Sequence, residues 1–154
     1  MINYRTAARA DFPAIIRIWR EAFRDSAEGL NFLERYYSPV SSFVADDGGA
    51  VIAMAHLVYG GTYCGVACPY LYAVAVRSDK RGLGLGKGIT LFAVQEAHAL
   101  GYAAIAACPE QPSLTEFYRK LGFTHTTPLN GDFRPTREML RYVSFMDTVL
   151  VRYG

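Results

Sequence analysis

The chain has 154 residues, of which 51% are hydrophobic and 19% are charged, and its net charge is +2. This length predicts one domain with a single core, and the apolar content excludes intrinsic disorder, which requires few apolar groups and a high net charge. The charge is balanced, with 16 basic and 14 acidic residues. It gives no electrostatic reason to expect a nucleic acid as partner.

The three cysteines, Cys64, Cys68 and Cys108, are an odd number. An odd number disfavours a disulfide framework and favours free thiols in a reducing, cytoplasmic setting. A zinc site is not expected, because Cys64 and Cys68 lack a second pair of ligands nearby. No apolar run reaches the roughly 18 residues of a membrane helix, and no signal peptide is recognisable. We therefore expect a soluble protein without a metal or a membrane partner.

Hydrophobic periodicity and turn residues divide the chain into alternating strands and helices. In chain order we expect a strand over 2–6, helices over 12–23 and 29–37, strands over 42–45, 50–59 and 70–76, a helix ending near 100, a strand over 103–107, a helix over 112–121, a strand over 123–127, a short helix over 134–141 and a strand over 145–152. Asp11 can cap the first helix, Gly101 ends the long one, and 60–69 is predicted as a loop. This order predicts a mixed α/β sheet.

Four of the 14 glycines fall within seven residues, in Arg81-Gly-Leu-Gly-Leu-Gly-Lys-Gly88, between a predicted strand and a predicted helix. Glycine allows the backbone to approach a ligand, and the helix N-terminus adds a partial positive charge. These features predict an anion site, most naturally for a phosphate or diphosphate. A P-loop is excluded, because Arg81 and Gly88 stand where it needs a glycine and a hydroxyl. A dinucleotide fingerprint also fails, because Lys87 or Ile89 stands at its third glycine.

A third phosphate motif, Arg/Gln-x-x-Gly-x-Gly/Ala, is matched at every position from Arg81 to Gly86. At this segment the chain resembles the GNAT superfamily (GCN5-related, acyl-CoA-dependent N-acetyltransferases). The strand over 70–76 looks like the fourth strand of the family. The segment Gln111-Pro-Ser-Leu-Thr-Glu-Phe-Tyr118-Arg-Lys-Leu-Gly122-Phe123 is similar to its Asn-x6-Tyr-x3-Gly-Phe segment.

The resemblance extends almost from end to end, since Arg5, Asp11 and the closing segment 147–152 also fit the family. It implies a mixed, mostly antiparallel central sheet of about seven strands with about four helices. It also implies one N-acetyltransferase domain over residues 1–154 and acetyl-CoA as the co-substrate.

The resemblance further implies which residues bind the coenzyme. Backbone amides from Gly82 to Lys87 would hold the diphosphate, and the backbone of 74–76 would pair with the pantetheine arm and polarise the thioester carbonyl near Val76. Gln111 stands where the family usually has asparagine and keeps an amide. The implied coenzyme-binding residues are Val74, Ala75, Val76, Arg81, Gly82, Leu83, Gly84, Leu85, Gly86, Lys87, Gln111 and Tyr118.

Tyr118 matches the family tyrosine that protonates the departing thiolate. A phenol suits this role because its reference pKa of about 10 lies above that of a thiol. The alternative is a core tyrosine whose hydroxyl makes a structural hydrogen bond and takes no part in catalysis.

The general base is where the sequence departs from the family pattern. The positions that match the family glutamates carry Tyr70 or Tyr72 and Ala106. Glu21 lies between Arg17 and Arg24 at helical pairing distance, which favours a solvated ion-pair face. His56 on a strand is more often structural than basic. We expect deprotonation relayed by water, or an acceptor that is already partly neutral.

Acceptor specificity in such folds usually lies between the first strand and the hairpin, and between the last two strands. The substrate candidates are Tyr36, Tyr70 and Tyr72, with Tyr37, Tyr59 and Tyr63 as further members of an aromatic pocket. All of them also fit ordinary core or surface positions. Arg134, Arg137 and Arg141 fall on one predicted helical face and suit an acidic acceptor, although Glu138 among them favours a solvated face.

The leading interpretation is a cytoplasmic N-acetyltransferase that acts on a primary amine of a small molecule or peptide, without a nucleic-acid or membrane partner. A homodimer is compatible with it. The alternative is a catalytically idle acyl-CoA sensor of the same fold, suggested by the missing carboxylate. A nucleotide-binding α/β domain is weakened by the failed motifs.

Overall fold

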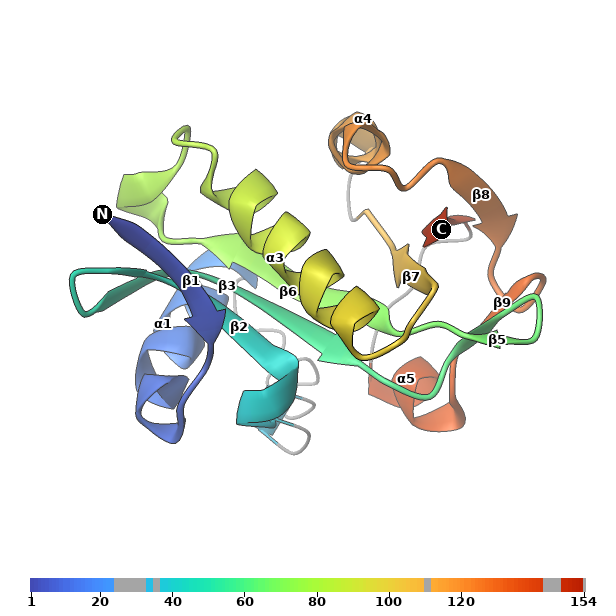
Figure 1. The fold of residues 1–154 in the computed structure, drawn as a ribbon, viewed down its shortest axis with the longest axis horizontal. Coiled ribbons are helices and arrows are strands. Elements are labelled where there is room, and N and C mark those ends of the chain that lie inside the picture. Colours follow the sequence, from blue (N-terminus) through green and yellow to red (C-terminus); the bar gives the residue numbers. More distant parts are fainter. Residues whose placement is uncertain (24–32, 35–36, 110–111, 143–147, 154) are drawn as a thin grey trace. The chain divides into compact units, whose positions relative to one another are not determined.

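The computed structural model describes residues 1–23, 33–34, 37–109, 112–142 and 148–153 of the chain (Figure 1). The strands are β1 (Ile2–Thr6), β2 (Ser42–Asp47), β3 (Ala50–Val58), β4 (Thr62–Tyr63), β5 (Val66–Ala67), β6 (Tyr70–Val76), β7 (Ala104–Ala107), β8 (His125–Pro128), β9 (Phe133–Arg134) and β10 (Thr148–Tyr153). The α-helices of the described residues are α1 (Phe12–Phe23), α3 (Leu85–Ala99), α4 (Pro112–Lys120) and α5 (Arg137–Tyr142).

Seven strands are hydrogen-bonded into one sheet in the order β1-β2-β3-β6-β7-β10-β8. The pairs β1–β2, β2–β3, β7–β10 and β8–β10 are antiparallel, whereas β6 and β7 are parallel. This sheet and the four described α-helices confirm the predicted mixed, mostly antiparallel architecture of about seven strands and four helices.

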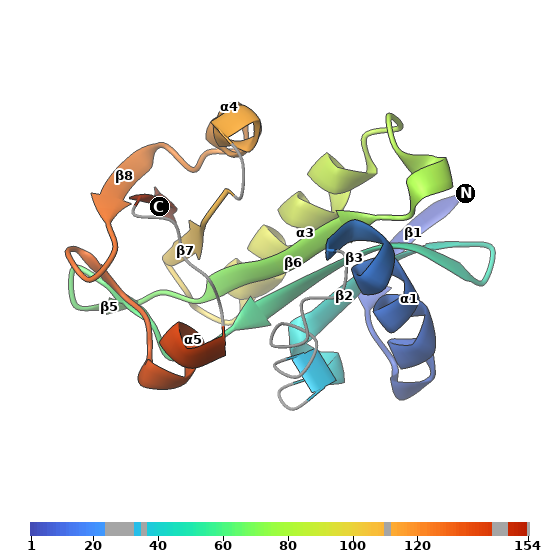
Figure 2. The ribbon, with the colours of Figure 1, turned by 180° about the vertical axis from the view of Figure 1, so that it is seen from behind.

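The chain divides into two compact units, and the first comprises Met1–Leu57 and Ala73–Ala93. Helix α1 and the beginning of α3 lie on opposite faces of its strands, as Figures 1 and 2 show from the two sides. On the α1 face, Ile15, Ile18 and Trp19 pack with Val44 and Met54 in one buried cluster. This packing stabilises α1, because apolar residues that repeat at helical spacing form one buried stripe.

An ion-pair network fastens the start of α1 to β1 and β2 within the first unit. The Arg5 guanidinium donates to both carboxylate oxygens of Asp11, at 2.7 and 3.0 Å, and its Nε donates to Asp46 at 3.1 Å. Asp11 also accepts from the Ala8 backbone N–H at 2.7 Å. The predicted capping role of Asp11 therefore takes a different form. The residue ends a 3-10 turn over Arg9–Asp11, which precedes α1 and is closed by this bond.

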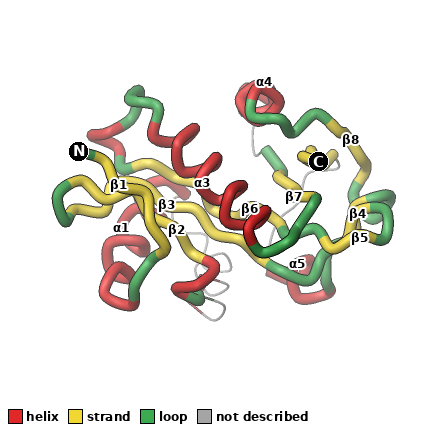
Figure 3. The backbone as a smooth tube through the Cα atoms, viewed as in Figure 1, coloured by secondary structure: helices red, strands yellow, loops and turns green. Residues whose placement is uncertain are grey.

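The second unit comprises Val58–Tyr72 and Val94–Gly154. It contains a three-stranded sheet in the order β5-β4-β9, and two of its strands, β4 and β5, lie where the sequence predicted only a loop over 60–69 (Figure 3). Short strands of two residues carry little hydrophobic periodicity, which is why the pattern missed them. Phe133 of β9 is fully buried, and its ring lies 3.3 Å from the position that a side chain on Gly61 would occupy.

Most element bounds agree closely with the sequence predictions, and β1 and β6 agree residue for residue. The helix predicted from residue 134 is wrong at its start: Arg134 belongs to β9 and α5 begins at Arg137. Thr62 pairs with Arg134, so tertiary pairing decides that position. Most of the helix predicted over 29–37 falls outside the described residues.

The three cysteines are free thiols, of which Cys68 is buried, Cys108 is half-buried and Cys64 is exposed, whereas the sequence suggested only buried or half-buried thiols. Burial raises the pKa of the Cys68 thiol to about 12, so this thiol stays protonated and unreactive at neutral pH. In the part of the chain that the structure describes, no helix combines the length and the apolar content needed to cross a bilayer.

Candidate functional site

The predicted anion loop lies between the end of β6 and the start of α3, within the first unit. Gly82 and Gly84 adopt left-handed backbone conformations, with φ of +83° and +78°. A side chain at either position would meet no atom of the described residues within 4 Å, so space is open beside both. Helix α3 begins at Leu85, directly after the second of these glycines. The loop thus combines open backbone with the positive end of a 15-residue helix, the arrangement that binds anionic groups.

Gly88, the last glycine of the cluster, has a different role. Its Cα faces Tyr4 of β1, and a methyl group there would overlap the hydroxyl and ring of that tyrosine. The Tyr4 ring also stacks on Phe92, one turn further along α3, with ring centroids 6.3 Å apart. Gly88 therefore serves the packing of α3 on β1. The other three glycines lie within the matched motif, where Gly84 and Gly86 occupy its two glycine positions and Gly82 occupies an unspecified one.

Side chains of the loop divide into buried and exposed ones. Leu85 is buried, whereas Leu83 is 69% exposed, and Arg81 and Lys87 are exposed as well. The Arg81 Nε donates to the Val76 carbonyl at 3.4 Å. The loop consequently presents backbone and two cations to solvent.

Strand β6 carries a backbone irregularity at Ala73. This alanine has a φ of +57°, a left-handed conformation that costs a non-glycine residue about 1 kcal/mol or more. The register of β6 with β7 runs over Tyr70 and Leu71, just before it. Beyond it, Ala75 is buried in the α1 cluster while Val74 and Val76 are half-buried. Alanine gives no sequence signal for such a conformation, so the sequence could not reveal it.

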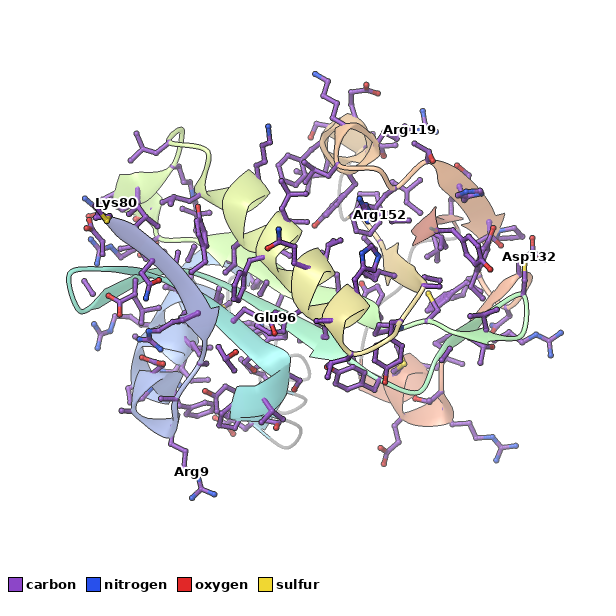
Figure 4. The ribbon with its side chains drawn as sticks, viewed as in Figure 1. Arg9, Lys80, Glu96, Arg119, Asp132 and Arg152 are labelled. Atoms are coloured by element: carbon purple, nitrogen blue, oxygen red, sulfur yellow. The ribbon has the colours of Figure 1, made fainter. Side chains whose placement is uncertain are left out.

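Glu21, near the end of α1, makes a contact that helical spacing did not predict. Its carboxylate accepts the backbone N–H of Ser78 at 2.5 Å. Ser78 begins the 3-10 turn Ser78–Lys80, which precedes the glycine loop; Lys80 is labelled in Figure 4. The predicted ion-pair partner Arg24 lies outside the described residues.

Tyr118 lies in α4 of the second unit and is 9% exposed. Its ring packs edge-on against Phe117 and Phe123, at centroid distances of 5.1 and 5.6 Å. Its carbonyl accepts the N–H groups of Leu121 and Phe123 at 3.0 and 3.1 Å. The tyrosine is thus held by the turn that ends its helix.

The position of Arg152 explains why a glycine, Gly122, follows Tyr118 in the Tyr-x3-Gly-Phe motif. Gly122 has a φ of +97°, and a side chain there would come within 2.6 Å of the Arg152 Nε. That Nε donates to the Leu121 carbonyl at 3.1 Å; Arg152 is labelled in Figure 4. The Gly-Phe pair therefore builds the turn that positions Tyr118.

His56 of β3 is 4% exposed. Its Nδ1 lies 2.8 Å from the Ser42 Oγ, and its buried Nε2 has no hydrogen-bond partner among the residues that the structure describes. Burial lowers the pKa of His56 to about 4, so the imidazole is neutral at physiological pH. These observations favour the structural role over that of a base.

We expect His56 to make the fold sensitive to mild acid. In the unfolded chain the imidazole protonates near pH 6.5, whereas the native one resists protonation down to about pH 4. The unfolded state therefore binds more protons in this window, and stability falls as the pH falls. The free energy of unfolding should decrease by about 2 kcal/mol between pH 8 and pH 5 from this group alone. Urea denaturation over this range should show a shallower pH dependence for His56→Gln; an unchanged dependence would contradict the prediction.

Each of the predicted acceptor tyrosines that the structure describes has its own packing contacts. Tyr70 and Tyr72 neighbour each other in β6, with ring centroids 6.5 Å apart, and Tyr70 is buried. Tyr59 stacks on Tyr102, and Tyr63 packs with His125 and Tyr153. Tyr37 donates to the Ala8 carbonyl at 3.1 Å and packs on Phe12.

Two predicted site residues, Tyr36 and Gln111, lie outside the described residues. Among the described ones, no group of three or more histidine, cysteine, aspartate or glutamate residues is arranged to hold a metal ion.

The sequence matches the family model of the acetyltransferase (GNAT) domain over residues 3–126. No curated protein sequence matches significantly. Among solved structures, the chain is similar to N-acetylglutamate synthase from Neisseria gonorrhoeae complexed with coenzyme A and N-acetyl-glutamate, with 17% identity over 99% of this chain and 35% of that one, and a TM-score of 0.68. It is also similar to a GCN5-related N-acetyltransferase from Anabaena variabilis, with 17% identity over 84% of this chain and 32% of that one, and a TM-score of 0.70.

A third solved structure is a GNAT family N-acetyltransferase from Escherichia coli in complex with CoA, with 19% identity over 99% of this chain and 81% of that one, and a TM-score of 0.71. The chain spans about a third of the length of the Neisseria and Anabaena proteins. At these identities the likeness shows the fold, whereas the family model covers most of the sequence. The chain therefore belongs to the GNAT family of acetyltransferases.

Proposed function

We propose that the protein is an N-acetyltransferase that moves the acetyl group of acetyl-CoA directly to a primary amine of a small molecule or peptide. The observation that carries this proposal is the loop before α3, where two left-handed glycines with open space beside them precede the positive end of the helix. Such a loop suits a diphosphate, because consecutive backbone N–H groups can point at its oxygens.

The residues of the loop and of β6 offer the backbone groups that the coenzyme needs. Amides from Gly82 to Lys87 would hold the diphosphate, and the backbone of Val74–Val76 would pair with the pantetheine arm. The left-handed residue Ala73 immediately precedes that stretch and supports a special role for this end of the strand. Coenzyme A bound to the Escherichia coli and Neisseria proteins of the same fold gives further support.

The proposed chemistry needs few side chains. The acceptor ammonium loses a proton to water, and its nitrogen then forms a bond with the acetyl carbon while the C–S bond breaks. Tyr118 donates its phenolic proton to the departing thiolate, and the proton lost by the new amide nitrogen returns to solvent, which reprotonates the phenolate. The matching base positions carry Tyr70 or Tyr72 and Ala106, which is why we propose water as the relay.

For the acceptor we propose a small-molecule or peptide amine. The Neisseria structure of the same fold contains N-acetyl-glutamate, an amino acid acetylated on nitrogen, which supports an acceptor of this class. Tyr70 and Tyr72, adjacent in β6, remain our proposed contacts for it. The free cysteines support a cytoplasmic location.

Replacing Gly84 with alanine tests the coenzyme site. Alanine at a φ of +78° is strained and turns the neighbouring N–H groups away, so the Kd of CoA should rise about tenfold or more. Gly48→Ala is the matched control, because Gly48 also has a positive φ, +60°, and open space beside it, but lies in the β2–β3 turn. Calorimetric titration with CoA should separate the two variants. An equal rise in the Kd of CoA for both variants would show that backbone strain anywhere in the fold weakens binding, and would contradict a coenzyme site at Gly84.

The idle sensor is the second candidate, favoured by the absence of a carboxylate at the matching positions Tyr70, Tyr72 and Ala106. Thiol release from acetyl-CoA over a panel of primary amines discriminates the two. Turnover with any amine establishes the transferase. Tight CoA binding without turnover across the panel, and without an effect of Tyr118→Phe, supports the sensor.

A further inference from the structure

We infer that Glu21 is a positioning residue for the coenzyme: it holds the turn that precedes the glycine loop and so presets the loop for the diphosphate. The inference rests on the proposed coenzyme site. It concerns a residue on α1, outside the strand, loop and helix that form that site.

The contact joins two segments that are far apart in the sequence. The Glu21 carboxylate accepts the Ser78 N–H at 2.5 Å across a separation of 57 residues. Ser78 starts the turn Ser78–Lys80, and the first left-handed glycine, Gly82, follows two residues after it. Glu21 therefore anchors the loop close to its N-terminal end.

The loop has few other described attachments. The Arg77 N–H donates to the Ile52 carbonyl at 2.8 Å at its start, and Arg81 donates back to Val76. Residues from Arg81 to Gly84 are all exposed, and in the described part of the chain no atom lies within 4 Å of the position that a side chain on Gly82 or Gly84 would occupy. Loop segments with little packing have many accessible conformations, and ordering them on binding costs affinity. The hydrogen bond from Ser78 to Glu21 restricts the loop in the free protein, so less affinity is lost to ordering when the coenzyme binds.

The hydrogen bond between Glu21 and Ser78 needs an acceptor oxygen and does not need the negative charge of Glu21. A carboxylate near a diphosphate is repulsive by itself. Arg77 and Asp79 form their own ion pair, with the Arg77 Nε 2.6 Å from the Asp79 carboxylate. The effect therefore comes from the oxygen that accepts the Ser78 N–H, and a glutamine also supplies such an oxygen.

Four variants test this assignment by calorimetric titration with CoA. Glu21→Ala removes the acceptor, and Glu21→Gln keeps an acceptor without charge. Ser78→Pro removes the donor from the other side. Proline is tolerated at the first position of a helical turn, and Arg77 before it, with φ of −54° and ψ of 137°, already has the conformation that precedes proline. Arg17→Ala is the control, an exposed residue one turn earlier on the same helix.

We expect Glu21→Ala and Ser78→Pro each to raise the Kd of CoA about threefold to tenfold, the effect of one lost hydrogen bond. The double variant should be no weaker than either single one, because both break the same contact. Glu21→Gln and Arg17→Ala should stay within about twofold of the wild type. An unchanged Kd for Glu21→Ala, multiplied effects in the double variant, or a Glu21→Gln as weak as Glu21→Ala would each overturn the inference.

Amide hydrogen exchange of residues 78–84 in the free protein provides a measurement that does not depend on CoA. Exchange should be faster in Glu21→Ala than in Arg17→Ala. Equal rates would overturn the inference that Glu21 holds this turn. A wild type that does not bind CoA would refute the proposed function, whereas tight wild-type binding with unaffected variants would refute only the role of Glu21.

Discussion

Replacing Tyr118 with phenylalanine is expected to lower kcat by about 10²–10⁴-fold, the usual cost of losing a general acid. The change removes one oxygen and keeps the ring, whose packing against Phe117 and Phe123 should persist. The thiolate would then have to leave without a proton donor. Thiol release from acetyl-CoA with saturating amine measures the effect, and the Kd of CoA should change much less than kcat.

The matched control for this variant is Tyr102→Phe. Tyr102 lies in the same unit and stacks on Tyr59 at a centroid distance of 5.5 Å, so the substitution also removes one hydroxyl from a packed ring. It should leave kcat within a few fold of the wild type. Normal turnover by Tyr118→Phe would assign Tyr118 to the core and leave protonation of the thiolate to solvent.

Replacing Gly88 with alanine should destabilise the fold by about 2 kcal/mol, because a methyl group there overlaps the Tyr4 ring and overpacked sites cost this much. In a Tyr4→Ala background the same substitution should stabilise the fold by about 1 kcal/mol, since alanine favours a helix over glycine. The sign of the effect should thus reverse, with a coupling free energy of about 3 kcal/mol between the two positions.

Urea denaturation of the four proteins in this cycle measures that coupling. CoA binding by Gly88→Ala provides a second readout, because Gly88 lies after the segment Gly82–Lys87 that we assign to the diphosphate. The Kd should be preserved where the variant remains folded. Destabilisation of the same size in both backgrounds would show that Tyr4 is not the cause.

Much of the fold could be predicted from the sequence, because strands and helices depend on local spacing. The apolar run 70–76 and the start 2–6 form strands with the predicted bounds. Glycines in alternation after a strand indicated a loop and a helix start, and α3 begins within that segment. The motif around Tyr118 likewise predicted a helix that ends at a glycine. The roles of these residues toward acetyl-CoA stay predictions.

By itself, then, the sequence determined the longer strands and helices and the family, since each depends on local pattern. Only the tertiary structure decided that Gly88 makes room for Tyr4, that Arg134 joins a strand, and that Glu21 reaches Ser78. It also decided that His56 is buried, which lowers its pKa. These properties arise from contacts between residues distant in the chain, and such contacts depend on packing that no spacing rule encodes.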